Sequence, residues 1–286
     1  MAYINSTIYS NVLRQEVALD LFLPNDKPDR GIIEPQGVIY FLHGLGSSEK
    51  RFREYTAVNR YAADNDLAMV YVSAPQSFYN DMKYGLPYYT YITEELPQLL
   101  KSLYNIDFPR EKTFIAGLSM GGYGAFRIGL SKPEMFAGVA SLSGACDIRM
   151  MAETVKKMPV IEGDSKSFIP AFGEDCDIKD EQDLYYLAKK VAEMPKEKQP
   201  RIALMTGKQD DLFFLHDQAK ALGEYMKGLD LREFKYMGNN IYNKAHNRKY
   251  CDHRVYRKYQ STQSKDPCHM SYNITCRHHS HHQHFL

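Results

Sequence analysis

Short apolar runs alternate with helical stretches along most of this chain, and that alternation constrains its fold more than any other feature. Residues 37–42, Gly-Val-Ile-Tyr-Phe-Leu, form a continuous apolar run of the kind found in strands buried on both faces of a parallel sheet. Further runs of this kind are residues 67–72, 113–116, 136–142 and 202–205. The helical stretches are residues 53–63, 93–104, 123–130, 183–192 and 216–227. Because alternating strands and helices require crossover connections, the sequence predicts an α/β domain whose mostly parallel central sheet has helices on both faces.

The two ends of this pattern and one interior segment need separate interpretation. Residues 12–23 alternate well enough for an early half-buried strand, and residues 232–236 supply a last one. We find no internal repeat and no linker before residue 260, so we expect a single domain over residues 1–259. Residues 147–180 contain methionines and phenylalanines among turn residues, without a clear strand. We interpret them as a small cap over a pocket or, alternatively, as a surface loop.

The C-terminal residues 260–286 differ from the rest of the chain. They have no apolar periodicity and end in a histidine-rich run that begins at His278. We expect them to be disordered or to result from a cloning change or frame error, with a metal-binding tract as the alternative. The five cysteines are scattered without a C-x-x-C pair, which favours reduced thiols over a zinc or redox centre.

Charge and hydropathy argue against several classes of partner. Lys plus Arg number 36 and Asp plus Glu 35, so a formal charge of +1 gives no field that would recruit nucleic acid or an anionic membrane. Residues 1–13 lack the pattern of a signal peptide, and no run of about 18 apolar residues is present. We therefore expect a cytoplasmic protein with no nucleic-acid or membrane partner, which could form a homo-oligomer.

The motif Gly117-Leu118-Ser119-Met120-Gly121 lies between a predicted strand and a predicted helix. This is the setting that the G-x-S-x-G nucleophile elbow requires. A serine on so sharp a turn has strained backbone angles, and glycines two residues away let neighbouring backbone pass without Cβ clashes. The pattern favours Ser119 as a nucleophile over a chance glycine-rich turn, and it indicates an α/β-hydrolase fold.

An oxyanion hole needs a pair of N–H donors near that nucleophile. The Met120 amide, at the start of the predicted helix, is the first candidate. The run His43-Gly44-Leu45-Gly46-Ser47 follows the strand at 37–42, where an α/β-hydrolase has its other oxyanion loop, so the Leu45 amide is the second. We interpret His43 as bracing this loop and not as a catalytic base.

The acid and the base should follow the nucleophile in the chain order Ser, Asp or Glu, then His. Asp210 follows the strand at 202–205 and is the favoured acid, with Asp211 a close rival and Asp147 a weaker one. His246 is the first histidine after the last strand and is the favoured base, ahead of His253. Its neutral imidazole would take the serine proton, and the carboxylate would fix its tautomer.

Three further segments carry a resemblance to a known family. They are Tyr-Gly-Leu-Pro-Tyr-Tyr-Thr at 84–90, Glu-Glu-Leu-Pro at 94–97, and the long run from Arg110 to Gly124 that includes the elbow. Over roughly residues 5–258 the chain resembles small bacterial esterases of the tributyrin esterase type, relatives of S-formylglutathione hydrolase (esterase D). The resemblance implies that the family's nucleophile, acid and histidine fall on Ser119, Asp210 and His246. It also implies short acyl ester substrates, in some members acetyl or feruloyl groups on plant-wall sugars, and no cofactor or metal.

These observations give a leading functional hypothesis and two alternatives. The first is a serine carboxylesterase that hydrolyses short-chain esters of small molecules through an acyl-enzyme. The second is a thioesterase of the S-formylglutathione hydrolase kind. The third is a non-catalytic binding protein on a hydrolase scaffold, because a fold alone does not determine function.

Overall fold

The computed structural model describes residues 1–27, 31–157, 165–208 and 214–239. Residues Met1–Asn243 form one compact unit, and Lys244–Leu286 form a second that lies outside the described residues. The expected single domain over 1–259 and the expected disordered or artefactual end at 260–286 therefore stay predictions.

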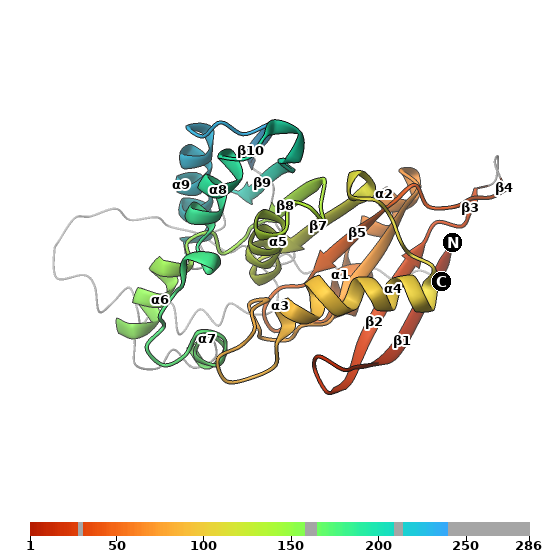
Figure 1. The fold of residues 1–286 in the computed structure, drawn as a ribbon, viewed down its shortest axis with the longest axis horizontal. Helices are drawn as coiled ribbons and strands as arrows, with labels where there is room; N and C mark the ends of the chain where they lie inside the picture. The colour runs from red at the N-terminus through yellow and green to blue at the C-terminus, as the bar shows by residue number, and fades with distance from the viewer. Residues whose placement is uncertain (28–30, 158–164, 209–213, 240–286) are drawn as a thin grey trace, which may run out of the picture. The chain divides into compact units, whose positions relative to one another are not determined.

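An eight-stranded sheet runs through the described part of the first unit (Figure 1), in the order β1-β2-β6-β5-β7-β8-β9-β10. The β1–β2 and β2–β6 pairs are antiparallel, whereas the pairs from β6 through β10 are parallel. The predicted mostly parallel sheet is confirmed. The strands are β1 (Ala2–Ser10), β2 (Gln15–Leu23), β5 (Gly37–Leu42), β6 (Leu67–Val72), β7 (Thr113–Leu118), β8 (Gly138–Leu142), β9 (Arg201–Gly207) and β10 (Glu233–Asn239), with β3 (Asp26–Lys27) and β4 (Gly31–Ile32) paired separately.

Helices cover both faces of this sheet, as predicted. On β5, Val38, Tyr40 and Leu42 belong to the larger core cluster, which includes residues of α4, α5, α8 and α9. Phe41 points to the other face and packs with residues of α1 and α2, because successive side chains of a strand alternate between faces. The α-helices are α1 (Glu49–Tyr55), α2 (Val58–Asp64), α3 (Tyr88–Thr90), α4 (Leu96–Tyr104), α5 (Met120–Ser131), α6 (Ile148–Lys157), α7 (Ser165–Phe172), α8 (Leu184–Ala192) and α9 (Leu215–Lys227). Shorter segments are the π-helix η1 (Tyr91–Glu95) and the 3₁₀-helices η2 (Arg110–Lys112), η3 (Asp180–Gln182) and η4 (Lys196–Lys198).

Three sequence predictions differ from the structure in detail. The early strand predicted at 12–23 begins at Gln15, because residues 11–14 form the turn of a hairpin with β1, which the sequence analysis did not identify. The single helix predicted at 53–63 is two helices, α1 and α2, separated at Thr56-Ala57. Strand β10 extends to Asn239, beyond the predicted end at 236.

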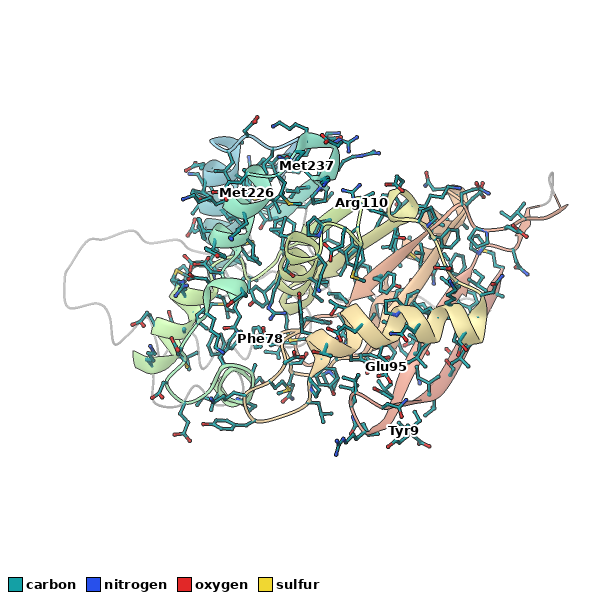
Figure 2. The ribbon with its side chains drawn as sticks, in the orientation of Figure 1. Tyr9, Phe78, Glu95, Arg110, Met226 and Met237 are labelled. Atoms are coloured by element: carbon teal, nitrogen blue, oxygen red, sulfur yellow. The ribbon has the colours of Figure 1, made fainter. Side chains whose placement is uncertain are left out.

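The segment predicted as a cap or a surface loop contains the helices α6 and α7. Phe168 and Phe172 of α7 pack on Phe78, labelled in Figure 2, with ring centroids 5.3 and 5.4 Å from it. The backbone N–H of Tyr84 also donates to the carbonyl of Pro170 at 2.9 Å. On α6, the Arg149 guanidinium forms ion pairs with the carboxylates of Asp180 and Asp183. This helical segment is therefore attached to the domain by aromatic packing and by backbone and charged contacts.

The parallel strands end side by side at one edge of the sheet. Leu42 of β5 pairs with Gly117 of β7, Leu118 pairs with Leu142 of β8, and Leu142 pairs with Met205 of β9. In open α/β sheets, ligands bind at this carboxyl edge. The loops that leave it carry Leu45, Ser119 and Asp147.

Candidate active site

Ser119 occupies the turn between β7 and α5, and its backbone has the strain that the motif predicts. Its φ of 58° and ψ of −118° lie in a region that residues other than glycine rarely adopt. Two backbone bonds hold the turn: the Ser119 N–H donates to the Leu142 carbonyl at 2.9 Å, and the Ser119 carbonyl accepts from the Tyr123 N–H at 3.1 Å. Ser119 is half-buried at the amino end of α5, so part of it remains in contact with solvent.

The two glycines of the motif lie where the backbone segments approach most closely. A Cβ on Gly117 would be 2.1 Å from the carbonyl oxygen of Gly121, and a Cβ on Gly121 would be 2.0 Å from the carbonyl oxygen of Leu42. Neither position has room for a side chain, so α5 begins this close to β5 and β7 because both residues are glycine. The steric explanation of the motif is thus confirmed.

The loop after β5 lies against the serine. A Cβ on Gly44 would be 3.4 Å from the Ser119 Cβ and 4.0 Å from its Oγ. The Gly44 carbonyl accepts hydrogen bonds from the Ser47 N–H at 3.2 Å and from the His43 ring at 2.9 Å. In a trans peptide the N–H of Leu45 points opposite to this carbonyl, so the two bonds also fix the direction of the Leu45 amide. Both candidate oxyanion donors, Leu45 and Met120, therefore belong to segments that adjoin Ser119.

His43 braces this loop, as the sequence analysis proposed. It is buried, its Nδ1 lies 2.9 Å from the Gly44 carbonyl, and its Nε2 accepts from the Ala74 N–H at 3.2 Å. Since a carbonyl can only accept and an amide can only donate, the ring is neutral with its proton on Nδ1. Burial lowers the pKa of His43 below its ordinary value. One ring nitrogen thus bonds this loop at Gly44, and the other bonds the segment after β6 at Ala74.

The favoured acid and base lie outside the described residues. Asp210 and Asp211 follow β9, which ends at Gly207, and His246 and His253 follow β10. Gly207 pairs with Asn239 of β10, so these two strands end together at the carboxyl edge of the sheet. The assignment of Asp210 and His246 therefore stays a prediction.

Asp147, the weaker acid candidate, has another role in the structure. Its carboxylate accepts from the backbone N–H of Met150, and its carbonyl accepts from the N–H of Met151. These bonds cap the first turn of α6, where backbone N–H groups otherwise lack partners. The contacts of Asp147 are those of a helix cap.

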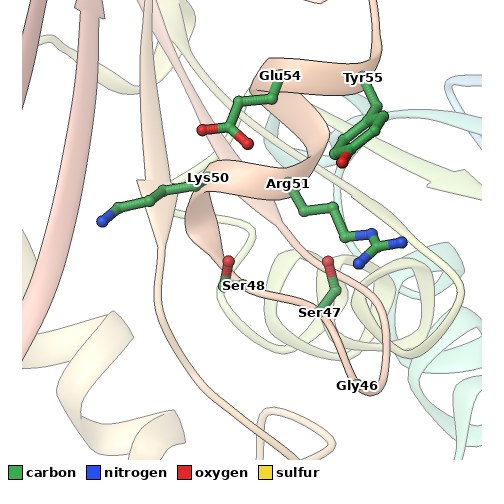
Figure 3. A pocket seen from close by; sticks show the side chains of 7 residues that line it. All are labelled: Gly46, Ser47, Ser48, Lys50, Arg51, Glu54 and Tyr55. Atoms are coloured by element: carbon green, nitrogen blue, oxygen red, sulfur yellow. The ribbon is translucent and has the colours of Figure 1, made fainter.

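An open pocket of about 380 Å³ lies next to the oxyanion loop (Figure 3). Its lining residues are Gly46, Ser47, Ser48, Lys50, Arg51, Glu54 and Tyr55. The Arg51 guanidinium carbon lies 5.3 Å from the centroid of the Tyr55 ring, and Figure 3 shows Ser47 on the same side of α1. Two cationic side chains, one carboxylate and three hydroxyls thus line a space that begins two residues from Gly44.

The described residues contain no cluster of three His, Cys, Asp or Glu side chains that could hold a metal ion. Within the same part of the chain, no helix is both long and apolar enough to cross a membrane.

The sequence analysis missed one segment that contacts the candidate site. The loop 74–80, between β6 and α3, reaches His43 through the Tyr79 hydroxyl and α5 through Arg127. Little in the sequence indicates this, because none of the motifs includes these residues. The glycine at 124, within a helix, is the one local signal of a close approach.

The sequence of this chain matches a family model and is similar to that of a curated esterase. The model of the Esterase family, described as "Putative esterase", matches residues 10–262. Among curated proteins, an acetyl esterase from Caldicellulosiruptor saccharolyticus is 29% identical over 240 residues, which cover 81% of this chain and 89% of the relative.

Two solved structures from Staphylococcus aureus are also similar. One is FphF, a fluorophosphonate-binding serine hydrolase with bound substrate, which is 27% identical with a TM-score of 0.69, over 91% of this chain and 97% of FphF. The other is the S-formylglutathione hydrolase FrmB in its apoenzyme form, which is 29% identical with a TM-score of 0.65, over 83% of this chain and 91% of FrmB.

Proposed function

Because the chain belongs to the Esterase family, has the α/β-hydrolase fold and is a serine hydrolase of carboxylic esters, we propose that it cleaves short-chain acyl esters with Ser119 as the nucleophile. The observation that carries this proposal is the strained position of Ser119 at the β7–α5 turn, with Gly44 of the oxyanion loop against its side chain. Since the chain is an enzyme, the alternative of a non-catalytic binding protein is set aside.

The reaction would proceed through an acyl-enzyme. The Ser119 Oγ forms a bond to the ester carbonyl carbon while the imidazole of His246 takes its proton, and the carboxylate of Asp210 or Asp211 orients that ring. The carbonyl electron pair moves onto oxygen, where the Leu45 and Met120 N–H groups stabilise it. Collapse breaks the bond to the alcohol, which receives the proton from the imidazolium. Water then attacks the acyl-enzyme by the same steps and releases the carboxylic acid.

We propose acetyl or feruloyl esters of plant-wall sugars as the natural substrate class. One support is the acetyl esterase that is 29% identical to this chain. A second is the short length of the α6–α7 segment, which offers little length to enclose a long acyl chain. Specificity resides in the site and not in the fold, so this assignment needs a direct assay.

The test of the nucleophile combines activity with covalent labelling. Ser119→Ala should lower kcat for p-nitrophenyl acetate by on the order of a million-fold, the loss typical of a missing triad nucleophile. The same substitution should abolish labelling by a fluorophosphonate, while the circular dichroism spectrum stays that of the wild type. Residual activity within tenfold of the wild type would overturn the assignment.

The pocket beside the oxyanion loop favours a second candidate function, a thioesterase that accepts S-formylglutathione. The glutathione leaving group carries two carboxylates, and Lys50 and Arg51 outweigh the single carboxylate of Glu54, so the pocket lining carries net positive charge. Gly46 on the pocket wall is two residues from Gly44, a span of at most about 7 Å. A leaving group as long as a tripeptide could therefore reach from Ser119 to Arg51.

A pair of arginine variants separates the two functions. Arg51→Gln should lower kcat/KM for S-formylglutathione by about fivefold, the effect of roughly 1 kcal/mol from an exposed charge interaction. It should leave kcat/KM for p-nitrophenyl acetate within twofold of the wild type. The matched control is Arg60→Gln, because Arg60 of α2 also lies over a tyrosine ring, at 5.1 Å from Tyr61. No turnover of S-formylglutathione, or equal losses in both variants, would exclude the thioesterase.

A further inference from the structure

The loop 74–80 holds three residues other than glycine in the left-handed region of backbone space. They are Gln76, Phe78 and Tyr79, with φ angles of 52°, 48° and 55°. Side chains disfavour this region, so such residues persist only where surrounding contacts determine them. The Ser77 hydroxyl supplies two of these contacts, since it donates to the Ala74 carbonyl and accepts from the Tyr79 N–H, both at 3.0 Å. The loop is therefore held in a conformation that presents Tyr79 inward.

Tyr79 contacts both of the segments that carry the candidate oxyanion donors. The residue is fully buried, and its hydroxyl donates to the His43 carbonyl at 2.7 Å. Its ring lies on α5, where a Cβ on Gly124 would be 2.3 Å from a ring carbon. Its own carbonyl accepts from the Arg127 guanidinium at 3.0 Å, one turn farther along α5.

These contacts lie close in sequence to the two donors. His43 is two residues before Leu45, and Gly124 is four residues after Met120. The His43 carbonyl oxygen also lies close to α5, because a Cβ on Gly121 would be 2.7 Å from it. The same oxygen thus adjoins both the helix that begins at Ser119 and the Tyr79 hydroxyl.

We infer that Tyr79 is a positioning residue, which sets the distance between the Leu45 and Met120 N–H groups by bonding the strand end at His43 while packing on α5. This inference rests on the proposed function, because it assigns a role to those amides. Tyr79 itself does not touch the reacting atoms. Arg127 supports it by fixing the Tyr79 carbonyl.

Loss of this hydroxyl should affect the transition state more than the bound substrate. Removing one oxyanion donor costs about 100- to 1,000-fold in kcat, and a displacement of about 1 Å is enough for a large part of that loss. We therefore expect Tyr79→Phe to lower kcat for p-nitrophenyl acetate by about 10- to 100-fold with KM within twofold of the wild type. Affinity for a trifluoromethyl ketone, which forms an oxyanion on Ser119, should fall by the same factor as kcat/KM.

The factor by which Tyr79→Phe lowers kcat should be independent of pH near neutrality. Burial raises the pKa of Tyr79 well above its ordinary value, so its hydroxyl remains a donor throughout. A variant that disturbed the base would instead change the pH profile of the rate. A constant ratio of wild-type to variant kcat between pH 6 and pH 9 is therefore part of the expected result.

Tyr89→Phe is the matched control. The Tyr89 hydroxyl also bonds to α5, at 2.9 Å from the Ser131 Oγ, but at the far end of that helix. Both variants lose one hydroxyl hydrogen bond, so a general effect on folding should lower the melting temperature of both. We expect kcat of Tyr89→Phe to stay within threefold of the wild type. Equal kcat losses in the two variants, or a Tyr79→Phe kcat within threefold of the wild type, would overturn the inference.

A second variant covers the case in which Tyr79→Phe does not fold. Arg127→Met removes the bond to the Tyr79 carbonyl and leaves the hydroxyl in place, and it should lower kcat by about 3- to 10-fold with KM unchanged. Unchanged kcat in Arg127→Met would then overturn the inference. Activity retained in Ser119→Ala would overturn the proposed function. The comparison of Tyr79→Phe with Tyr89→Phe tests the positioning role of Tyr79, so the two failures can be told apart.

Discussion

Replacing Gly121 with alanine would place a methyl group 2.0 Å from the Leu42 carbonyl oxygen and 2.7 Å from the His43 carbonyl oxygen. An ordinary contact between carbon and oxygen is about 3.3 Å or more, so backbone must move by about 1 Å to admit the methyl group. Overpacking of this kind costs about 1–3 kcal/mol or more, and the better helix propensity of alanine offsets about 1 kcal/mol of it. The atoms in the way belong to backbone, which has no rotamer to change, so we expect an overpacking cost above this range, about 3–4 kcal/mol, and a net loss of about 2–3 kcal/mol.

Two measurements test this expectation. For a chain of this size 1 kcal/mol corresponds to roughly 2–4 °C, so Gly121→Ala should lower the melting temperature by about 5–10 °C. The displaced segment leads into the oxyanion loop, so kcat for p-nitrophenyl acetate should fall by about 100-fold. Gly228→Ala is the control, because its Cβ would be 3.4 Å from the Tyr225 carbonyl, an ordinary contact. A Gly121→Ala protein that melts within 2 °C of the wild type with kcat within threefold would refute the reasoning.

Three further predictions concern acyl length, the base and the buried histidine. In a p-nitrophenyl ester series, kcat/KM should be highest for acyl chains of two to four carbons, and a steady rise to dodecanoate would contradict this. The rate should increase with pH through a group with a pKa of about 6.5–7, because only neutral imidazole accepts the serine proton. His246→Ala should abolish both the activity and its increase with pH, whereas His253→Ala should abolish neither. The reverse result would exchange the two assignments. Burial lowers the pKa of His43, so below about pH 6.5 the unfolded chain binds a proton that folded His43 does not. The free energy of unfolding should therefore decrease as the pH is lowered. His43→Gln should flatten this fall in melting temperature between pH 8 and pH 5, whereas identical slopes would contradict it.

Features that depend on local sterics were predictable from the sequence. The Gly-Leu-Ser-Met-Gly motif determines a turn that requires small neighbours, and Ser119 has the strained angles that such a turn imposes. Likewise, the apolar runs at 37–42 and 67–72 coincide with β5 and β6, because a strand buried on both faces needs apolar side chains at every position. His43 could be interpreted correctly because its place at the end of a strand already suggested a role in the loop.

The hairpin strand β1 shows where sequence patterns fall short. Its side chains alternate between exposed and half-buried over most of its length, and few of them enter the core. Its identity as a strand comes from pairing with β2, and that pairing is a tertiary contact which periodicity alone does not predict. The break between α1 and α2 at Thr56-Ala57 similarly lacks a glycine or proline that would announce it.

The sequence by itself determined the layered α/β architecture and the strained turn at Ser119, because both depend on residue types within short stretches of the chain. Only the tertiary structure decided how the two segments that carry the proposed oxyanion donors are held together. Tyr79 carries no motif, and its left-handed backbone would be disfavoured in isolation. It acquires a role because folding brings His43, Gly124 and Arg127 around it, from segments 36 to 48 residues apart in the chain. Contacts of that kind depend on where the chain places its elements, and no local pattern records them.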